Sequence, residues 1–155
     1  MDLSAKIGII NETGTIVSVN CCLNGGIDNT GLLLYNYYND IELISKLVKY
    51  GAVYQLKKYI DKGIFNKNES REETTIFDIR DRNYPISLRK SITNRNINGF
   101  ISSCKEVDAK YGYLFDKENN EWICYDLVNN ESFRLEDKLR ELGYITEEKE
   151  GHKSL

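Results

Sequence analysis

Apolar, β-branched residues form two neighbouring runs near the start of the chain. The runs cover residues 6–10 and 15–23, and residues 11–14 between them, Asn-Glu-Thr-Gly, are of the types that form tight turns. This pattern predicts an N-terminal β-hairpin.

A second hairpin is predicted near the other end of the chain. Apolar and polar residues alternate over 111–115 and again over 122–127, and a polar turn at 116–120 lies between these runs. The turn is rich in Asp and Asn, which favour tight reversals of the backbone.

Helical spacing appears in two parts of the chain. After the first hairpin, we expect a helix around residues 34–41, a second helix that Asp40 caps and Gly51 ends, and a third helical stretch over residues 53–60. Near the C-terminal end, a last helix ends at Gly143. The apolar positions that define these helices are Leu34, Tyr37, Tyr38, Ile41, Ile44, Val48, Val53, Leu56, Ile60, Leu135, Leu139 and Leu142.

Residues 66–103 show little regular pattern, apart from a possible strand over 74–79. A structureless stretch of this length is uncommon in a compact domain, so it is either a functional loop or a segment whose structure the pattern does not reveal.

The order of these elements predicts an α+β fold. We expect a mainly antiparallel sheet, built from the N-terminal and C-terminal hairpins, with the helices packed on one side. With 155 residues, the chain fits a single domain over 1–145, followed by a charged tail over 146–155 that we expect to be frayed.

Composition narrows the class of protein further. The chain is 41% hydrophobic, carries a net charge of −3, and contains no apolar run of the roughly 20 residues that span a bilayer. The first residues lack the features of a secretory signal, so we expect a cytoplasmic protein without a membrane partner.

The residues needed for common catalytic and metal sites are scarce. The only histidine, His152, lies in the expected tail, and the four cysteines do not have the spacing of a zinc site. Pairs of carboxylates remain possible for a metal-dependent enzyme, but no pair is distinguished from surface charge. We therefore expect a non-enzymatic protein without a cofactor or a metal.

A glycine-rich loop connects the first hairpin to the first helix. It lacks the spacing of a nucleotide-binding glycine motif, yet free backbone N–H groups at a helix N-terminus favour anions, and glycines let a ligand approach the backbone. An ordinary strand-to-helix turn explains the same residues. The candidate ligand-binding residues in this loop are Asn24, Gly25, Gly26 and Asp28.

A basic segment at residues 80–95 is the second candidate. It carries five basic residues and one acid within a chain of negative net charge. Arginine forks suit phosphate, and an aromatic ring can stack on a base, so the candidates are Arg80, Arg82, Arg89 and Tyr84, together with Trp122 from the second hairpin. A solvated basic loop that balances the acidic residues at 69–73 is the alternative. The negative net charge argues against general nucleic-acid binding.

Eleven tyrosines are many for a chain of this length. Tyrosine is enriched where one edge of a ring stays in water, including subunit interfaces, so we expect a homo-oligomer.

The N-terminal third resembles a family of small phage, prophage and mobile-element proteins. The pattern is carried by Ile7-Gly8, Asn11-Glu12, Gly14, Ile16, Ser18, Cys21, Gly25, Gly31, Leu34, Tyr38-Asn39-Asp40 and Gly51, and the hairpin with Tyr113-Leu114-Phe115-Asp116 and Trp122 is similar to the family's C-terminal hairpin. Members commonly read Cys-His-x-Asp-Gly-Tyr at the loop. Here Cys22 and Asn24 replace the His and Asp, which favours binding over catalysis.

The resemblance implies a phage protein that counters bacterial defence. One class of such proteins sequesters nucleotide signals of Thoeris and cyclic-oligonucleotide systems in pockets of small homo-oligomers. The expected function is therefore the binding of a small phosphorylated nucleotide signal in the cytoplasm of a bacterial host. The alternatives are an inhibitor that binds a host defence protein and a metal-dependent enzyme that cleaves the nucleotide.

Overall fold

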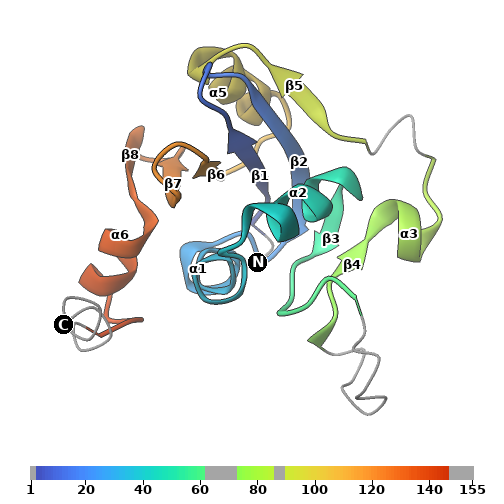
Figure 1. Ribbon diagram of the computed structural model, residues 1–155, viewed down its shortest axis with the longest axis horizontal. Coiled ribbons are helices and arrows are strands. Elements are labelled where there is room, and N and C mark those ends of the chain that lie inside the picture. Colours follow the sequence, from blue (N-terminus) through green and yellow to red (C-terminus); the bar gives the residue numbers. More distant parts are fainter. Residues whose placement is uncertain (1–2, 62–72, 86–89, 147–155) are drawn as a thin grey trace.

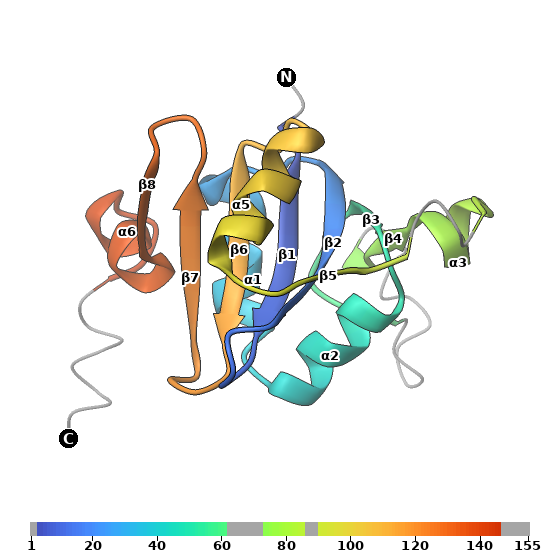
Figure 2. The same cartoon turned by 90° about the horizontal axis from the view of Figure 1, so that it is seen from above.

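A computed structural model describes residues 3–61, 73–85 and 90–146. Within these residues, one eight-stranded sheet forms the centre of the molecule (Figures 1 and 2). Its strands are β1 (Ala5–Ile10), β2 (Ile16–Leu23), β3 (Val53–Gln55), β4 (Ile76–Phe77), β5 (Ile92–Asn94), β6 (Tyr111–Asp116), β7 (Glu121–Asp126) and β8 (Glu131–Arg134).

The sheet is mixed and mostly antiparallel. Its strand order is β4-β3-β2-β1-β6-β7-β8, and β5 pairs with the first half of β2. Two pairs are parallel: β2 with β3, and β1 with β6. The second pair joins the N-terminal hairpin, β1–β2, to the C-terminal strands β6–β7–β8, which are far away in the sequence.

Helices connect the strands and cover both faces of the sheet. A π-helix η1 (Ile27–Gly31) leads into α1 (Leu32–Tyr37) and is followed by α2 (Ile41–Lys49), α3 (Asp78–Arg82), α5 (Ile97–Glu106) and α6 (Leu135–Glu141). Among the described residues, no helix is long and apolar enough to span a bilayer.

The two faces of the sheet differ in what covers them. One face packs against α1, α2 and α6, whose buried residues include Leu34, Ile44 and Leu139. The opposite face packs against α5, and Phe100 and Cys104 form a smaller cluster there. Figure 1 shows α5 on one side of the sheet and α1 and α2 on the other.

The expected α+β class and the mainly antiparallel sheet are confirmed. Both predicted hairpins form, Asp40 Oδ1 accepts the Glu42 N–H at 3.2 Å, and Gly51 and Gly143 have positive φ angles just after α2 and α6. The expectation that the helices pack on one side holds for α1, α2 and α6, whereas α5 covers the other face.

One prediction about local structure is wrong. The stretch expected to be helical over 53–60 begins as strand β3, because Val53 and Gln55 pair with Cys21 and Leu23 of β2. Of the two alternatives for residues 66–103, the one in which the pattern does not reveal regular structure holds for the described residues, which contain α3, β5 and α5. Helix α5 begins at a cap where Asn96 Oδ1 accepts the Gly99 N–H at 2.8 Å. Of the strand expected over 74–79, only the two residues of β4, Ile76–Phe77, form a strand. Almost all of the expected tail lies outside the described residues.

Candidate functional site

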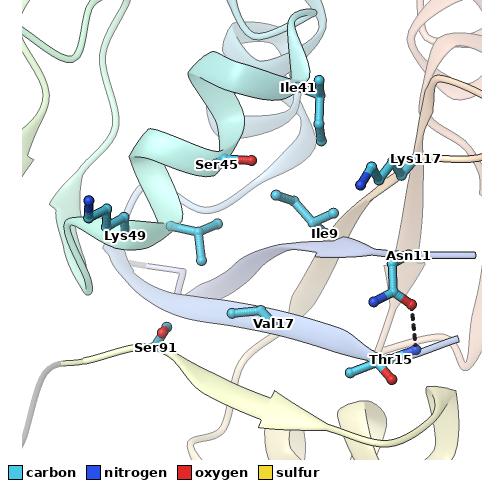
Figure 3. A pocket seen from close by; sticks show the side chains of 10 residues that line it. Ile9, Asn11, Thr15, Val17, Ile41, Ser45, Lys49, Ser91 and Lys117 are labelled. Atoms are coloured by element: carbon cyan, nitrogen blue, oxygen red, sulfur yellow. Dashed lines mark hydrogen bonds between the residues drawn. The ribbon is translucent and has the colours of Figure 1, made fainter. Parts of the chain in front are cut away.

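A groove lies between α2 and the turn end of the β1–β2 hairpin (Figure 3). We call it the α2 groove. Its volume is about 370 Å³, which falls within the size range of small-ligand sites. Its lining residues are Ile9, Asn11, Thr15, Val17, Ile41, Ser45, Val48, Lys49, Ser91 and Lys117.

The floor of the α2 groove is apolar. Ile9 and Val17 are direct cross-strand partners in the β1–β2 hairpin, so their side chains lie on the same face of the sheet. Ile41 and Val48 are seven residues apart on α2, which places them on one side of the helix. The floor therefore offers an apolar surface for a ring or a hydrocarbon.

Two lysines stand at opposite ends of the α2 groove (Figure 3). Lys49 is the last residue of α2, and Lys117 follows directly after β6. Both are exposed, and neither has an ion-pair partner among residues 3–61, 73–85 and 90–146. The helix between Ile41, at the Lys117 end, and Lys49 rises by about 12 Å over its eight residue steps.

Asn11 adds an oriented hydrogen-bond donor. Its Oδ1 accepts the backbone N–H groups of Thr13 and Thr15, both at 3.1 Å. These two bonds fix the orientation of the amide, because only the oxygen can accept them. Figure 3 shows the other end of the amide, Nδ2, pointing toward the groove.

The groove as a whole combines cations and neutral donors with an apolar floor. The hydroxyls of Thr15, Ser45 and Ser91 complete its polar lining. Among the described residues that line it, there is no carboxylate, histidine or cysteine, and no part of the described chain gathers three or more side chains that suit a metal. This set of groups suits the binding of an anion with an apolar or ring-shaped body.

The predicted glycine loop is packed into the fold. The N–H of Gly25 donates to Leu3 O at 2.7 Å, and its carbonyl accepts the hydroxyl of Tyr113 at 2.7 Å. A Cβ at Gly25 would lie 2.8 Å from the Cβ of Ala5, so glycine is required there by close packing. The backbone carbonyl of Asn24 accepts the Thr30 hydroxyl at 2.7 Å, and Gly26, the N-cap of η1, has no side-chain cap hydrogen bond. Hydrogen bonds to Leu3 and Tyr113 and within the loop therefore hold its backbone in place.

The predicted basic residues Arg80 and Arg82 lie together and are both neutralised. Arg80 contacts Asp61 at 2.7 Å and Asp81 at 3.0 Å. Arg82 contacts Asp78 at 3.1 Å and donates to the Tyr84 hydroxyl at 2.9 Å.

Aromatic rings enclose the Arg82 guanidinium. The guanidinium carbon, Cζ, lies 3.8 Å from the centroid of the Tyr54 ring and 4.6 Å from the centroid of the Tyr84 ring. These contacts give the two arginines a role in holding α3 to the sheet, and Arg89 lies outside the described residues.

Trp122 lies far from Arg80 and Arg82. It is 4% exposed, and its Nε1–H donates to the carbonyl of Tyr38 at 2.8 Å. Five strand steps separate β4 from β7, which corresponds to about 24 Å across the sheet. The residues predicted from the sequence therefore do not converge on one small pocket, and their roles as ligand contacts stay a prediction.

The cysteines are free thiols, and three of them are buried. Burial raises the pKa of Cys21 and of Cys104 to about 12, and it raises the pKa of Cys124 as well. These thiols stay protonated at neutral pH, which removes the reactive thiolate form.

The α2 groove was missed because its residues come from distant parts of the sequence. Lys49 is an ordinary charged residue at the end of a helix, and Lys117 sits in a hairpin turn. They line one groove only because β1 pairs with β6, which brings the β6–β7 turn beside the first hairpin. A parallel pairing of this kind leaves no signal in local sequence patterns.

Comparison with protein-family models, with curated proteins and with solved structures finds no match to this chain. The resemblance to small phage proteins therefore stays an expectation from the sequence.

Proposed function

We propose that this protein is a non-enzymatic phage or prophage protein that binds a small phosphorylated nucleotide and sequesters it from a bacterial defence system. The observation that carries the proposal is the α2 groove, with its apolar floor and a lysine at each end. The ligand would be an ADP-ribose derivative or a cyclic oligonucleotide.

The spacing of the lysines favours a ligand with more than one anionic group. A single phosphate would reach one ammonium, whereas two groups separated by a ring-containing body would reach both ends of the groove, along which α2 rises by about 12 Å from Ile41 to Lys49. The body of the ligand would lie on Ile9, Val17 and Val48, and Asn11 Nδ2 would donate to one of its oxygens. Each ammonium would gain a charge-assisted hydrogen bond, the stronger kind.

The lining favours binding over turnover. Hydrolysis of a phosphate ester needs a group that activates water or a metal that does so, and the lining supplies ammonium, amide and hydroxyl groups instead. Recovery of an intact ligand would follow from this proposal.

A second candidate function is the binding of a host defence protein. Tyr37 and Tyr59 are 37% and 40% exposed, and their rings meet edge to face at 6.2 Å. Lys58 lies over the Tyr37 ring at 5.7 Å. Exposed aromatic pairs of this kind anchor protein interfaces, either to a host protein or to a second copy of the chain.

The test is recovery of a small molecule from the purified protein. The protein is expressed in bacteria with an active nucleotide-signalling defence system, purified and heated, and the released material is identified by mass spectrometry. We expect a phosphorylated nucleotide from the wild type and none from Lys49→Gln/Lys117→Gln.

The matched control is Lys105→Gln/Lys110→Gln, which makes the same change in net charge on α5 and beside it. This control should release the same compound as the wild type. Release of no nucleotide by the wild type, together with capture of a host protein that Tyr37→Ala/Tyr59→Ala no longer captures, would replace the proposal with the second candidate.

A further inference from the structure

The most unusual residue of the α5 face is Lys6, in the middle of the sheet. Its side chain is fully buried, and its Nζ has no hydrogen-bond partner within the described chain. Buried lysines are normally paired, because an ammonium group removed from water loses its hydration without compensation. Lys6 therefore needs a separate explanation.

Two further buried polar atoms lie beside it without a partner. They are the hydroxyl of Ser18, whose residue is fully buried, and the amide oxygen of Asn20. Lys6 pairs with Asn20 and Gly8 pairs with Ser18 in the β1–β2 register, so all three side chains project from the same face of the sheet. The unsatisfied atoms form one cluster.

Helix α5 and strand β6 cover this cluster on one side. Lys6 also pairs with Gly112 of β6, where a Cβ would come within 2.7 Å of the Phe100 ring of α5. The helix is thus in tight contact with the sheet beside Lys6. Burial lowers the pKa of Lys6, while Cys104 and Glu106 on α5 act in the opposite direction.

The cluster reaches the edge of β2 at a break in strand pairing. β5 pairs with β2 over Ile16–Ser18, and β3 pairs with it at Cys21 and Leu23, so Asn20 lies between the two partners. Asn20 is only half-buried. This break in pairing is where the cluster comes nearest to the solvent-exposed side of β2.

We propose that Lys6, Ser18 and Asn20 hold one small inorganic anion of about the size of chloride. Lys6 supplies the positive charge, and the Ser18 hydroxyl donates to the anion. The Asn20 amide, turned so that its NH₂ faces inward, supplies a further donor. The tight cover by α5 and the narrow break between β5 and β3 exclude larger anions. This site is separate from the α2 groove, which lies on the other face of the sheet.

The test compares thermal unfolding in sodium chloride and in sodium gluconate at the same ionic strength, since gluconate is too large to enter. For the wild type, each tenfold increase in chloride above the dissociation constant should raise Tm by about 3–5 °C. Lys6→Met should lose this response, and Ser18→Ala should weaken it. Lys49→Gln/Lys117→Gln should keep it, which separates this site from the α2 groove.

A second measurement, ³⁵Cl nuclear magnetic resonance, uses the wild-type protein and so does not depend on the folding of a variant. Chloride that exchanges between solvent and a protein site gives a broadened ³⁵Cl resonance, so the wild type should broaden it and excess bromide should reverse the effect. Equal Tm values of the wild type in chloride and gluconate, a full chloride response in Lys6→Met, or no broadening of the resonance would each overturn the proposal.

Discussion

The two faces of the central sheet treat buried polar atoms differently. On the face covered by α1, α2 and α6, the polar ends of the large buried rings are all bonded: Tyr113 Oη donates to Gly25 O at 2.7 Å, Tyr38 Oη to Lys57 O at 2.6 Å, and Trp122 Nε1 to Tyr38 O at 2.8 Å. On the α5 face, Lys6 and Ser18 are buried without such partners.

The first face therefore stabilises the fold, whereas the buried polar groups of the α5 face lower its stability. The first face carries the larger apolar cluster and satisfies its polar groups, so it contributes most of the stability. The α5 face buries Lys6 without a hydrogen-bond partner, which costs stability, and our proposal assigns this cost to the binding of an anion. Replacement of a buried apolar residue on the first face and replacement of Lys6 on the α5 face should therefore change stability with different signs as well as by different amounts.

The largest contrast pairs Leu139→Ala with Lys6→Met. Leu139 is fully buried on the α6 side, so its truncation should lower the free energy of unfolding by about 2–5 kcal/mol. In gluconate, without chloride, Lys6→Met should leave stability unchanged or raise it, because Met fills similar space without a charge. Urea unfolding curves of both variants measure the contrast, and a loss of stability in Lys6→Met as large as that in Leu139→Ala would break it.

Tyr113→Phe tests the hydrogen bonding of the first face and the rigidity of the glycine loop together. The change removes the donor to the buried carbonyl of Gly25 and should cost about 1–3 kcal/mol. Amide hydrogen exchange should become faster at Gly25. Tyr111→Phe is the matched control, since its ring is only partly buried, and it should cost much less.

Two glycine substitutions on the α5 face should change the stability of the protein in opposite directions. A Cβ at Gly112 would lie 2.7 Å from the Phe100 ring, so Gly112→Ala should cost about 1–3 kcal/mol. A Cβ at Gly99, inside α5, would meet its nearest neighbour at 3.4 Å, and Gly99→Ala should stabilise by about 0.5–1 kcal/mol. Thermal unfolding of the two variants checks the signs. Equal destabilisation by the two substitutions would contradict the close contact of Phe100 with Gly112 and the ordinary contact distances around Gly99.

The pH dependence of stability should show the smallest effect. Burial lowers the pKa of Lys6 below 10.5, so at this site the folded state binds fewer protons than the unfolded state, and the contribution of Lys6 to stability should rise with pH from the folded pKa up to 10.5. Cys104 and Glu106 on α5 reduce the shift. In gluconate, the stability of Lys6→Met minus that of the wild type should therefore fall as pH rises over this window. A difference that stays constant would contradict an uncompensated charge at Lys6.

The parts of the fold that the sequence predicted are those set by local interactions. Both hairpins and the Asp40 cap follow from turn residues and short-range periodicity. A local signal for β8 was also present, because Asp-x-x-Asn-Asn-Glu occurs at 116–121 and again at 126–131. In both turns, the Asp carboxylate accepts the same two backbone N–H groups and the Asn side chain.

The parts that were missed depend on contacts between distant residues. β3 forms because β2 offers an open edge, which overrides the helical spacing of residues 53–60. Of the predicted site residues that the structure describes, Arg80 and Arg82 are paired with carboxylates from their own region, and Trp122 is buried on a strand far across the sheet. The α2 groove arises from the parallel β1–β6 pairing, so no local pattern pointed to it.

The central claim is that the α2 groove binds a phosphorylated nucleotide through Lys49 and Lys117. Titration calorimetry of the purified protein with cyclic ADP-ribose isomers and cyclic oligonucleotides tests it most directly. We expect saturable binding of at least one of these compounds, and a loss of affinity of about tenfold or more for each lysine replaced by Gln. We expect unchanged affinity in Lys105→Gln/Lys110→Gln. Binding that survives in Lys49→Gln/Lys117→Gln, or no binding of any of these nucleotides by the wild type, would contradict a nucleotide site in the α2 groove.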